Sequence, residues 1–139
     1  MQHEDYIKRQ IDQLGRVLGK ILIDLLGLKA SGNISEGIEV ADQTLKNERD
    51  LTFDEIASIP AEKFIATLQE EKKLSNDNLD SLAEILFLVA EELDEKGSDL
   101  EKKNEMYLRS LILYDHIEKI CSTYSLERHL KIKKIQNMQ

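Results

Sequence analysis

The sequence predicts an all-α protein, an antiparallel array of about five to six helices that forms one domain over residues 1–139. Leucine, isoleucine, glutamate and lysine dominate the composition, and these residues favour helix over sheet. β-branched residues never cluster in the alternating runs that strands require. With one proline and six glycines, the chain has few helix breakers. Its length is sufficient to bury a sizeable core without disulfides or metal ions.

The first helix is expected over residues 3–28 and carries a regular apolar heptad. Seven apolar residues step alternately by four and three positions, as on a helix with one apolar face. They are Ile7, Ile11, Leu14, Leu18, Ile21, Leu25 and Leu28. Leu22, Ile23 and Leu26 widen the apolar surface of the later half, which we therefore expect to be buried.

The earlier half of this helix is a candidate interface. Its members are Ile7, Ile11, Leu14, Gly15, Leu18 and Gly19. Gly15 and Gly19 lie one turn apart, and each costs roughly 1 kcal/mol relative to alanine inside a helix. Close approach of another helix would explain them. The pattern leaves two interpretations open, and we favour packing into the core over docking or dimerisation.

Two further helices with a short helical turn between them are expected at residues 35–48, 50–58 and 60–74. Ser35 is a plausible N-cap of the first. Phe53 and Ile56 would fill the core from the short turn. Pro60, the only proline, fits the first turn of the third segment, where its missing N–H costs nothing.

The second half of the chain predicts three helices, over residues 77–96, 99–122 and 125–137. Gly97 ends the first, and Ser98 with Glu101 has the spacing of a capping box that opens the next. So short a connection makes these two helices an antiparallel hairpin. The residues expected to face inward on the last two helices are Leu100, Tyr107, Leu111, Tyr114, Ile117 and Cys121, then Leu126, Leu130 and Ile135.

Two segments of this hairpin resemble a tetratricopeptide repeat. Leu79-x-x-Leu82-Ala83-x-x-Leu86 is similar to the large, large, small and large pattern of the repeat's first helix, and Tyr107-x-x-Ser110-Leu111 to its second. Lys103 departs from the pattern, and the proline that usually ends the repeat is missing. The resemblance implies a helical array that binds peptides or partner helices.

The opening of the chain also resembles an uncharacterised family of bacterial helical proteins. The matching residues are Asp5-Tyr6-Ile7-x-Arg9-x-Ile11-x-Gln13-Leu14-Gly15-x-x-Leu18. This resemblance implies a bacterial domain of unknown function with a repeat-like fold, and it implies no particular activity.

Charge and hydropathy narrow the classes of partner. Residues 30–124 carry 22 acidic and ten basic side chains, whereas residues 125–139 have a net charge of +3. An overall charge of −8 opposes general nucleic-acid binding, and we expect the basic tail to pair with the acidic body or to be solvated. The most apolar stretch is too short to span a bilayer, and the start has no signal-peptide core. A cytoplasmic protein is therefore expected.

No residue pattern predicts catalysis, a cofactor or a metal site. His116 lies one position from Asp115 and two from Glu118, whereas ligands on one helical face need spacings of three or four. Cys121 is five positions from His116, and we expect it to be a buried structural thiol. The acidic run from Glu91 to Glu95 is typical of a solvated helix face.

The sequence thus favours a non-enzymatic protein–protein interaction module that presents a helical surface or groove to a protein partner. One alternative is a structural homodimer formed through the heptad of the first helix. A further alternative is a small-ligand or metal site near His116 and the tyrosines of its helix.

Overall fold

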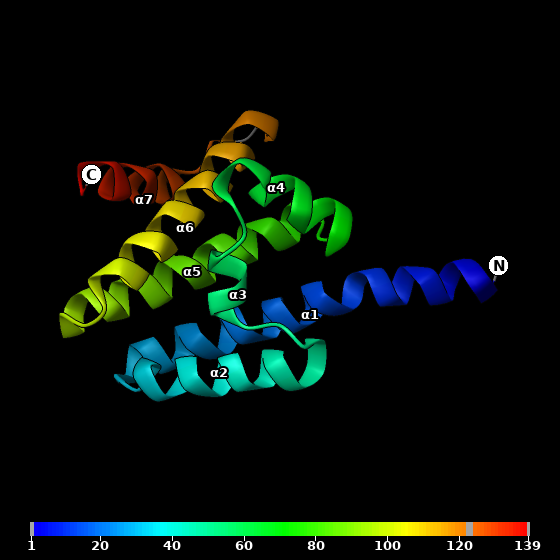
Figure 1. Ribbon diagram of the computed structural model, residues 1–139, viewed down its shortest axis with the longest axis horizontal. Helices are drawn as coiled ribbons and strands as arrows, with labels where there is room; N and C mark the ends of the chain where they lie inside the picture. The colour runs from blue at the N-terminus through cyan, green and yellow to red at the C-terminus, as the bar shows by residue number, and fades with distance from the viewer. Residues whose placement is uncertain (1, 122–123, 139) are drawn as a thin grey trace.

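The computed structural model describes the backbone of residues 2–121 and 124–138, and the side chains of these residues from Leu14 onward. Those residues form helices and connecting segments with no strand among them, which confirms the predicted all-α array (Figure 1). The four long helices are α1 (Gln2–Ser31), α2 (Ile34–Arg49), α5 (Asn76–Lys96) and α6 (Leu100–Ile120). The shorter ones are α3 (Phe53–Ala57), α4 (Phe64–Ala66) and α7 (Leu126–Asn137).

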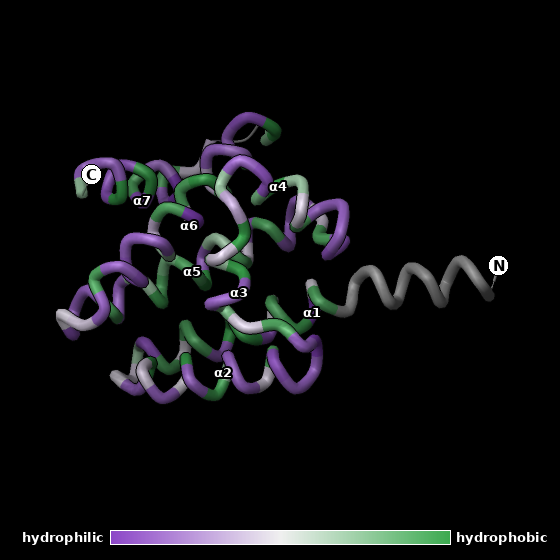
Figure 2. Tube along the Cα trace, in the orientation of Figure 1, coloured by the Kyte–Doolittle hydropathy of each residue, from purple (hydrophilic) through white to green (hydrophobic). Residues whose placement is uncertain are grey.

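Helix α5 is the centre of the core. Nine of its residues are buried, from Leu79 to Ala90. Ser75 caps its start by accepting a hydrogen bond from the Asn78 backbone amide. Gly97 ends it, as predicted, and has the left-handed conformation. In Figure 2 the hydrophobic colour is concentrated in segments at the middle of the molecule, α5 included. The apolar character of this helix on nearly every side therefore matches its central place.

Helices α5 and α6 form the predicted antiparallel hairpin. The Ser110 hydroxyl donates a hydrogen bond of 2.9 Å to the Ala83 carbonyl, at the point where small residues let the two helices approach. The predicted capping box is wrong, because the Ser98 amide donates to the Leu93 carbonyl and so completes the end of α5. Asp99 caps α6 instead, accepting from the Lys102 amide.

Helix α1 runs parallel to α5 along its side. Gly15 lies at Asn78 near the start of α5, and Lys29 forms a 3.1 Å ion pair with Glu91 near its end. A Cβ atom on Gly15 would lie 2.1 Å from the side-chain Nδ2 atom of Asn78. This glycine therefore makes room for a side chain of α5, as the expected close approach of another helix requires. A Cβ on Gly19 would meet no atom within 4 Å, and the same explanation is wrong there.

Two predicted helices begin or continue differently from expectation. Helix α2 starts at Ile34 after Asn33, so Ser35 is not its N-cap. The Ser35 hydroxyl accepts a hydrogen bond from the Lys96 ammonium instead. The segment after Pro60 is not one regular helix. It comprises a 3₁₀ turn (Ala61–Lys63), then α4, then a π turn (Thr67–Glu71).

Six side chains expected to be buried are exposed. They are Ile23, Leu26, Leu100, Cys121, Leu126 and Leu130. Leu126 and Leu130 cannot share a face with Ile135, because residues five and nine positions apart point to different sides of a helix. Helix α7 buries Arg128, Ile132 and Ile135 instead, at spacings of four and three.

Candidate binding groove

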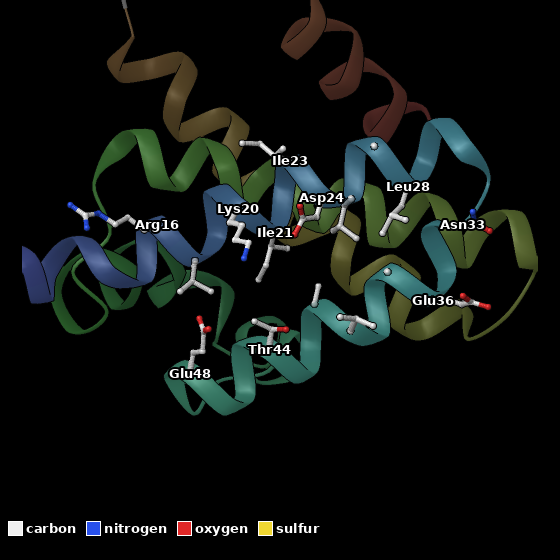
Figure 3. A pocket seen from close by; sticks show the side chains of 16 residues that line it. Arg16, Lys20, Ile21, Ile23, Asp24, Leu28, Asn33, Glu36, Thr44 and Glu48 are labelled. Atoms are coloured by element: carbon white, nitrogen blue, oxygen red, sulfur yellow. The ribbon is translucent and has the colours of Figure 1, made fainter.

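A groove lies between α1 and α2. It has a volume of about 1080 Å³ and is open to solvent. The two helices are antiparallel and are joined by Gly32 and Asn33. Figure 3 shows α2 leaning away from α1 between Glu36 and Glu48, so the groove is widest at the Glu48 end.

A glycine fixes the narrow end of the groove. A Cβ atom on Gly37 would lie 2.3 Å from the Leu28 Cδ1 atom, so only glycine allows α2 to approach α1 this closely without rearrangement. Gly37 is buried there against Leu25 and Leu28 of α1. The close contact at one end and the separation at the other leave the space between the helices unfilled.

The floor and walls of the groove are mainly apolar. The apolar residues that line it are Val17, Ile21, Leu25, Leu28, Val40 and Ala41. Ile21, Leu25 and Ala41 are buried, whereas Val40 on the α2 wall is 65% exposed. Ile23 is 72% exposed at the outer edge of α1 and points away from α2 (Figure 3), and it continues the apolar surface onto Leu26.

Charged side chains stand along both walls. Arg16, Lys20 and Asp24 belong to α1, and Glu36 and Glu48 belong to α2. None of the five forms an ion pair or a side-chain hydrogen bond with another residue whose side chain is described. The end near Arg16 and Lys20 carries most of the positive charge, and the Glu36 end is acidic.

Charged side chains of the basic tail and of α1 pair with acidic residues of α5. Glu91 of α5 accepts from Lys29 of α1 and from Lys134 of α7, at 3.1 and 3.0 Å. Glu84 of α5 accepts from the Tyr114 hydroxyl at 2.7 Å and also from the Lys131 ammonium. The basic tail therefore pairs with the acidic body, as the charge distribution predicted.

The residues of the predicted interface are divided by the structure. Leu14, Gly15 and Leu18 are buried inside the chain's own fold. Gly19 is partly exposed. The side chains of Ile7 and Ile11 lie outside the described ones. From Leu14 onward, the heptad therefore packs into the core at Leu14, Leu18, Ile21 and Leu25.

The residues around His116 do not come together as a site. Its Nε2 atom is buried with no hydrogen-bond partner among the described residues, and Cys121 is exposed beyond the end of α6. Tyr107 and Tyr114 are core residues, packed edge-on against Phe87 at centroid distances of 5.6 and 6.5 Å. Within the described part of the chain, no three metal-ligating side chains are grouped so as to hold an ion.

Sequence reasoning missed the groove, because it assigned Ile21 to Leu28 to the core as a block. The signal was available in part. Val40 lies outside the face of α2 that Ile38, Ala41 and Leu45 turn toward the core, so this apolar side chain is exposed to solvent. No described helix has an apolar stretch of the length and hydropathy that crossing a membrane requires.

Comparison with known proteins gives no match: no family model, no curated protein and no solved structure is significantly similar to this chain.

Proposed function

We propose that the chain is a non-enzymatic protein-interaction module that presents the α1–α2 groove to an amphipathic helix of a protein partner. The observation that carries the proposal is the open groove of about 1080 Å³ with an apolar floor and an exposed apolar residue, Val40, on its wall. Amphipathic helices bind in such grooves by inserting apolar side chains at spacings of three and four residues.

The unpaired charges on the walls support the same function. Arg16 and Lys20 on one wall and Glu36 on the other are available to a ligand, since none is paired with a described side chain. Charges at the edge of an interface mainly set orientation and partner choice, while the apolar centre supplies affinity. The lining includes no histidine, cysteine or serine, which favours binding over catalysis.

The tetratricopeptide-like character of the hairpin remains part of this proposal. The hydrogen bond from Ser110 to the Ala83 carbonyl joins the two small residues on which the resemblance depends. Arrays of such hairpins generally use their helical surfaces for binding.

A homodimer through the heptad of α1 is a weaker alternative. Leu14 and Leu18 are 5% and 1% exposed, so a partner reaching them would have to displace the core. A ligand site near His116 is weaker still, because Tyr107 and Tyr114 of the same helix are used in packing.

Site-specific photo-crosslinking in the native cell tests the groove. A photoreactive amino acid at Val40 should give a defined protein adduct, and the same probe at Leu100 should not. Leu100 is the matched control, because it is an exposed apolar residue of similar exposure on another helix. The adduct at position 40 should disappear when Thr44→Asp is introduced, because Thr44 lines the groove one turn from Val40.

Two results would count against the proposal: equal labelling at both positions, or an adduct at position 40 that Thr44→Asp leaves unchanged. Circular dichroism of each variant should show the helix content of the original chain, because none of the three positions is buried. A thermal-shift screen with metal ions and metabolites tests the His116 alternative separately.

A further inference from the structure

Helix α7 carries a second unpartnered apolar surface, on the face that turns away from the core. Leu126 and Leu130 are 60% and 57% exposed and lie one turn apart on that face. Lys133 continues the same stripe, and Glu127 flanks it on the other side. Neither Lys133 nor Glu127 is paired with a described side chain. The stripe is therefore an apolar ridge with one free charge of each sign.

We infer that the partner helix of the groove is α7 of a second copy of this chain. This inference rests on the proposed function of the groove and names its occupant. Leu126 and Leu130 of one copy lie over the groove beside Val40 of the next, with α7 parallel to α1. Glu127 then faces Lys20 and Arg16, and Lys133 faces Glu36.

The lengths of the two surfaces agree. Helix α7 has 12 residues, which corresponds to about 18 Å, and the α1 wall from Arg16 to Leu28 has nearly the same length. When Leu130 lies beside Val40, Lys133 is about 4.5 Å from Leu130 toward the C-terminal end of α7. Glu36 is about 6 Å from Val40 in the same direction, which is toward the N-terminal end of α2. Leu126 then lies level with Thr44, where the groove is wider (Figure 3).

The handedness of the helix selects this direction. Successive residues turn by about 100°, so Glu127 and Lys133 project to opposite sides of the line through Leu126 and Leu130. With α7 parallel to α1, Glu127 is on the α1 side and Lys133 on the α2 side. In the reverse direction, Lys133 would lie against Lys20 and Arg16, and Glu127 would lie against Glu36. Like charges at these positions would repel.

The contact joins two different surfaces, the groove of one copy and the exposed face of α7 of another, and each copy carries both. In Figure 1, α7 and α2 lie at opposite edges of the molecule, with α5 and α6 between them. A contact of this kind extends from copy to copy, as a ring or an open chain, instead of closing as a symmetric dimer.

Complementation between two disabled chains tests the inference. Val40→Asp disables the groove, and Leu130→Asp disables the ridge, and both positions are exposed enough to leave folding intact. In sedimentation velocity the original chain should associate with increasing concentration, whereas each variant alone should be monomeric. An equimolar mixture should form a one-to-one dimer and nothing larger, because one intact groove meets one intact ridge.

A charge exchange tests the orientation. Lys133→Glu and Glu36→Lys should each weaken association about tenfold, and the double variant should regain most of it. The matched control is Lys133→Glu with Glu48→Lys, which lies at the other end of the groove and should not restore association.

The inference is overturned if the original chain stays monomeric over the whole accessible concentration range, or if the mixed variants form no dimer. It is also overturned if both single variants assemble as the original chain does. The proposed function is tested separately, by the photo-crosslink at position 40. An adduct there with a different protein, together with a monomeric chain, would keep the groove and reject the second copy.

Discussion

Tyr107 and Tyr114 occupy equivalent positions on α6, seven residues apart, and both pack against Phe87. Their hydroxyls differ. The Tyr114 hydroxyl donates to Glu84, whereas the Tyr107 hydroxyl is buried with no hydrogen-bond partner among the described residues. Burial, with the nearby Asp94, Glu91 and Glu95 carboxylates, raises the pKa of Tyr107 to about 12. Burial and then the Glu84 carboxylate raise the pKa of Tyr114 as well.

Removing each hydroxyl should therefore have opposite effects on stability. Tyr107→Phe should leave the free energy of unfolding unchanged or raise it by up to about 1 kcal/mol, because an unsatisfied buried hydroxyl is lost. Tyr114→Phe should lower it by about 1–2 kcal/mol, because Glu84 loses a donor. Urea unfolding of both variants at neutral pH measures the difference. Equal destabilisation by the two substitutions would contradict this account.

At the same scale, glycine shows the limit of sequence reasoning. Gly15 and Gly19 have the same context in the sequence, one turn apart beside the heptad. Only Gly15 lies against another element, at Asn78, which is 63 positions further along the chain. Gly37, where the need for glycine is as clear, carries no local sign of it. Spacing along one helix cannot reveal which neighbour a helix will meet.

At the scale of elements, the long helices were predictable and the face of the last one was not. The bounds of α5 follow from its cap at Ser75 and from Gly97, both of which are local signals. The inner face of α7 depends on residues of other helices instead. Arg128 pairs with Glu118 of α6, and Lys131 pairs with Glu84 of α5. These ion pairs turn Ile132 and Ile135 inward and leave Leu126 and Leu130 outside.

Truncation of apolar side chains on α7 should confirm which face is inside. Ile135→Ala should lower the free energy of unfolding by about 2–4 kcal/mol, because Ile135 is fully buried. Leu130→Ala removes a side chain of the same size from the exposed face, and we expect a change within about 0.5 kcal/mol. Thermal or urea unfolding at low protein concentration gives both values. A larger effect at Leu130 than at Ile135 would reverse the assignment.

At the scale of the whole molecule, one carboxylate connects three helices. Glu91 on α5 holds Lys29 of α1 on one side and Lys134 of α7 on the other. Burial alone would raise the pKa of Glu91, but the hydrogen bonds from Lys134 and Lys29 outweigh it and keep the pKa below its ordinary value. Folding therefore favours the ionised form of this group.

The stability of the molecule should depend on pH through this group. Because the pKa of Glu91 is lower in the folded chain, its contribution is present above the ordinary value of 4.5 and is lost as the pH falls through the folded value. Glu91→Gln should lower stability at neutral pH and reduce the further loss as the pH falls below the ordinary value of 4.5. The matched control is Glu92→Gln, since Glu92 pairs only within its own helix, with Lys96. Thermal unfolding across this range compares them, and parallel curves for the two variants would refute the role of Glu91.

The sequence by itself determined the all-α class, the end of α5 at Gly97 and its hairpin with α6, because periodicity, caps and turn residues act within a few positions of one another. Only the tertiary structure decided that the heptad of α1 enters the core from Leu14 onward and that α2 leaves a groove beside it. It also decided which face of α7 is exposed. Those outcomes depend on contacts between residues distant in sequence, such as Gly15 with Asn78 and Lys131 with Glu84. A helix has several faces on which it can pack, and the partners that select one of them are contributed by other helices.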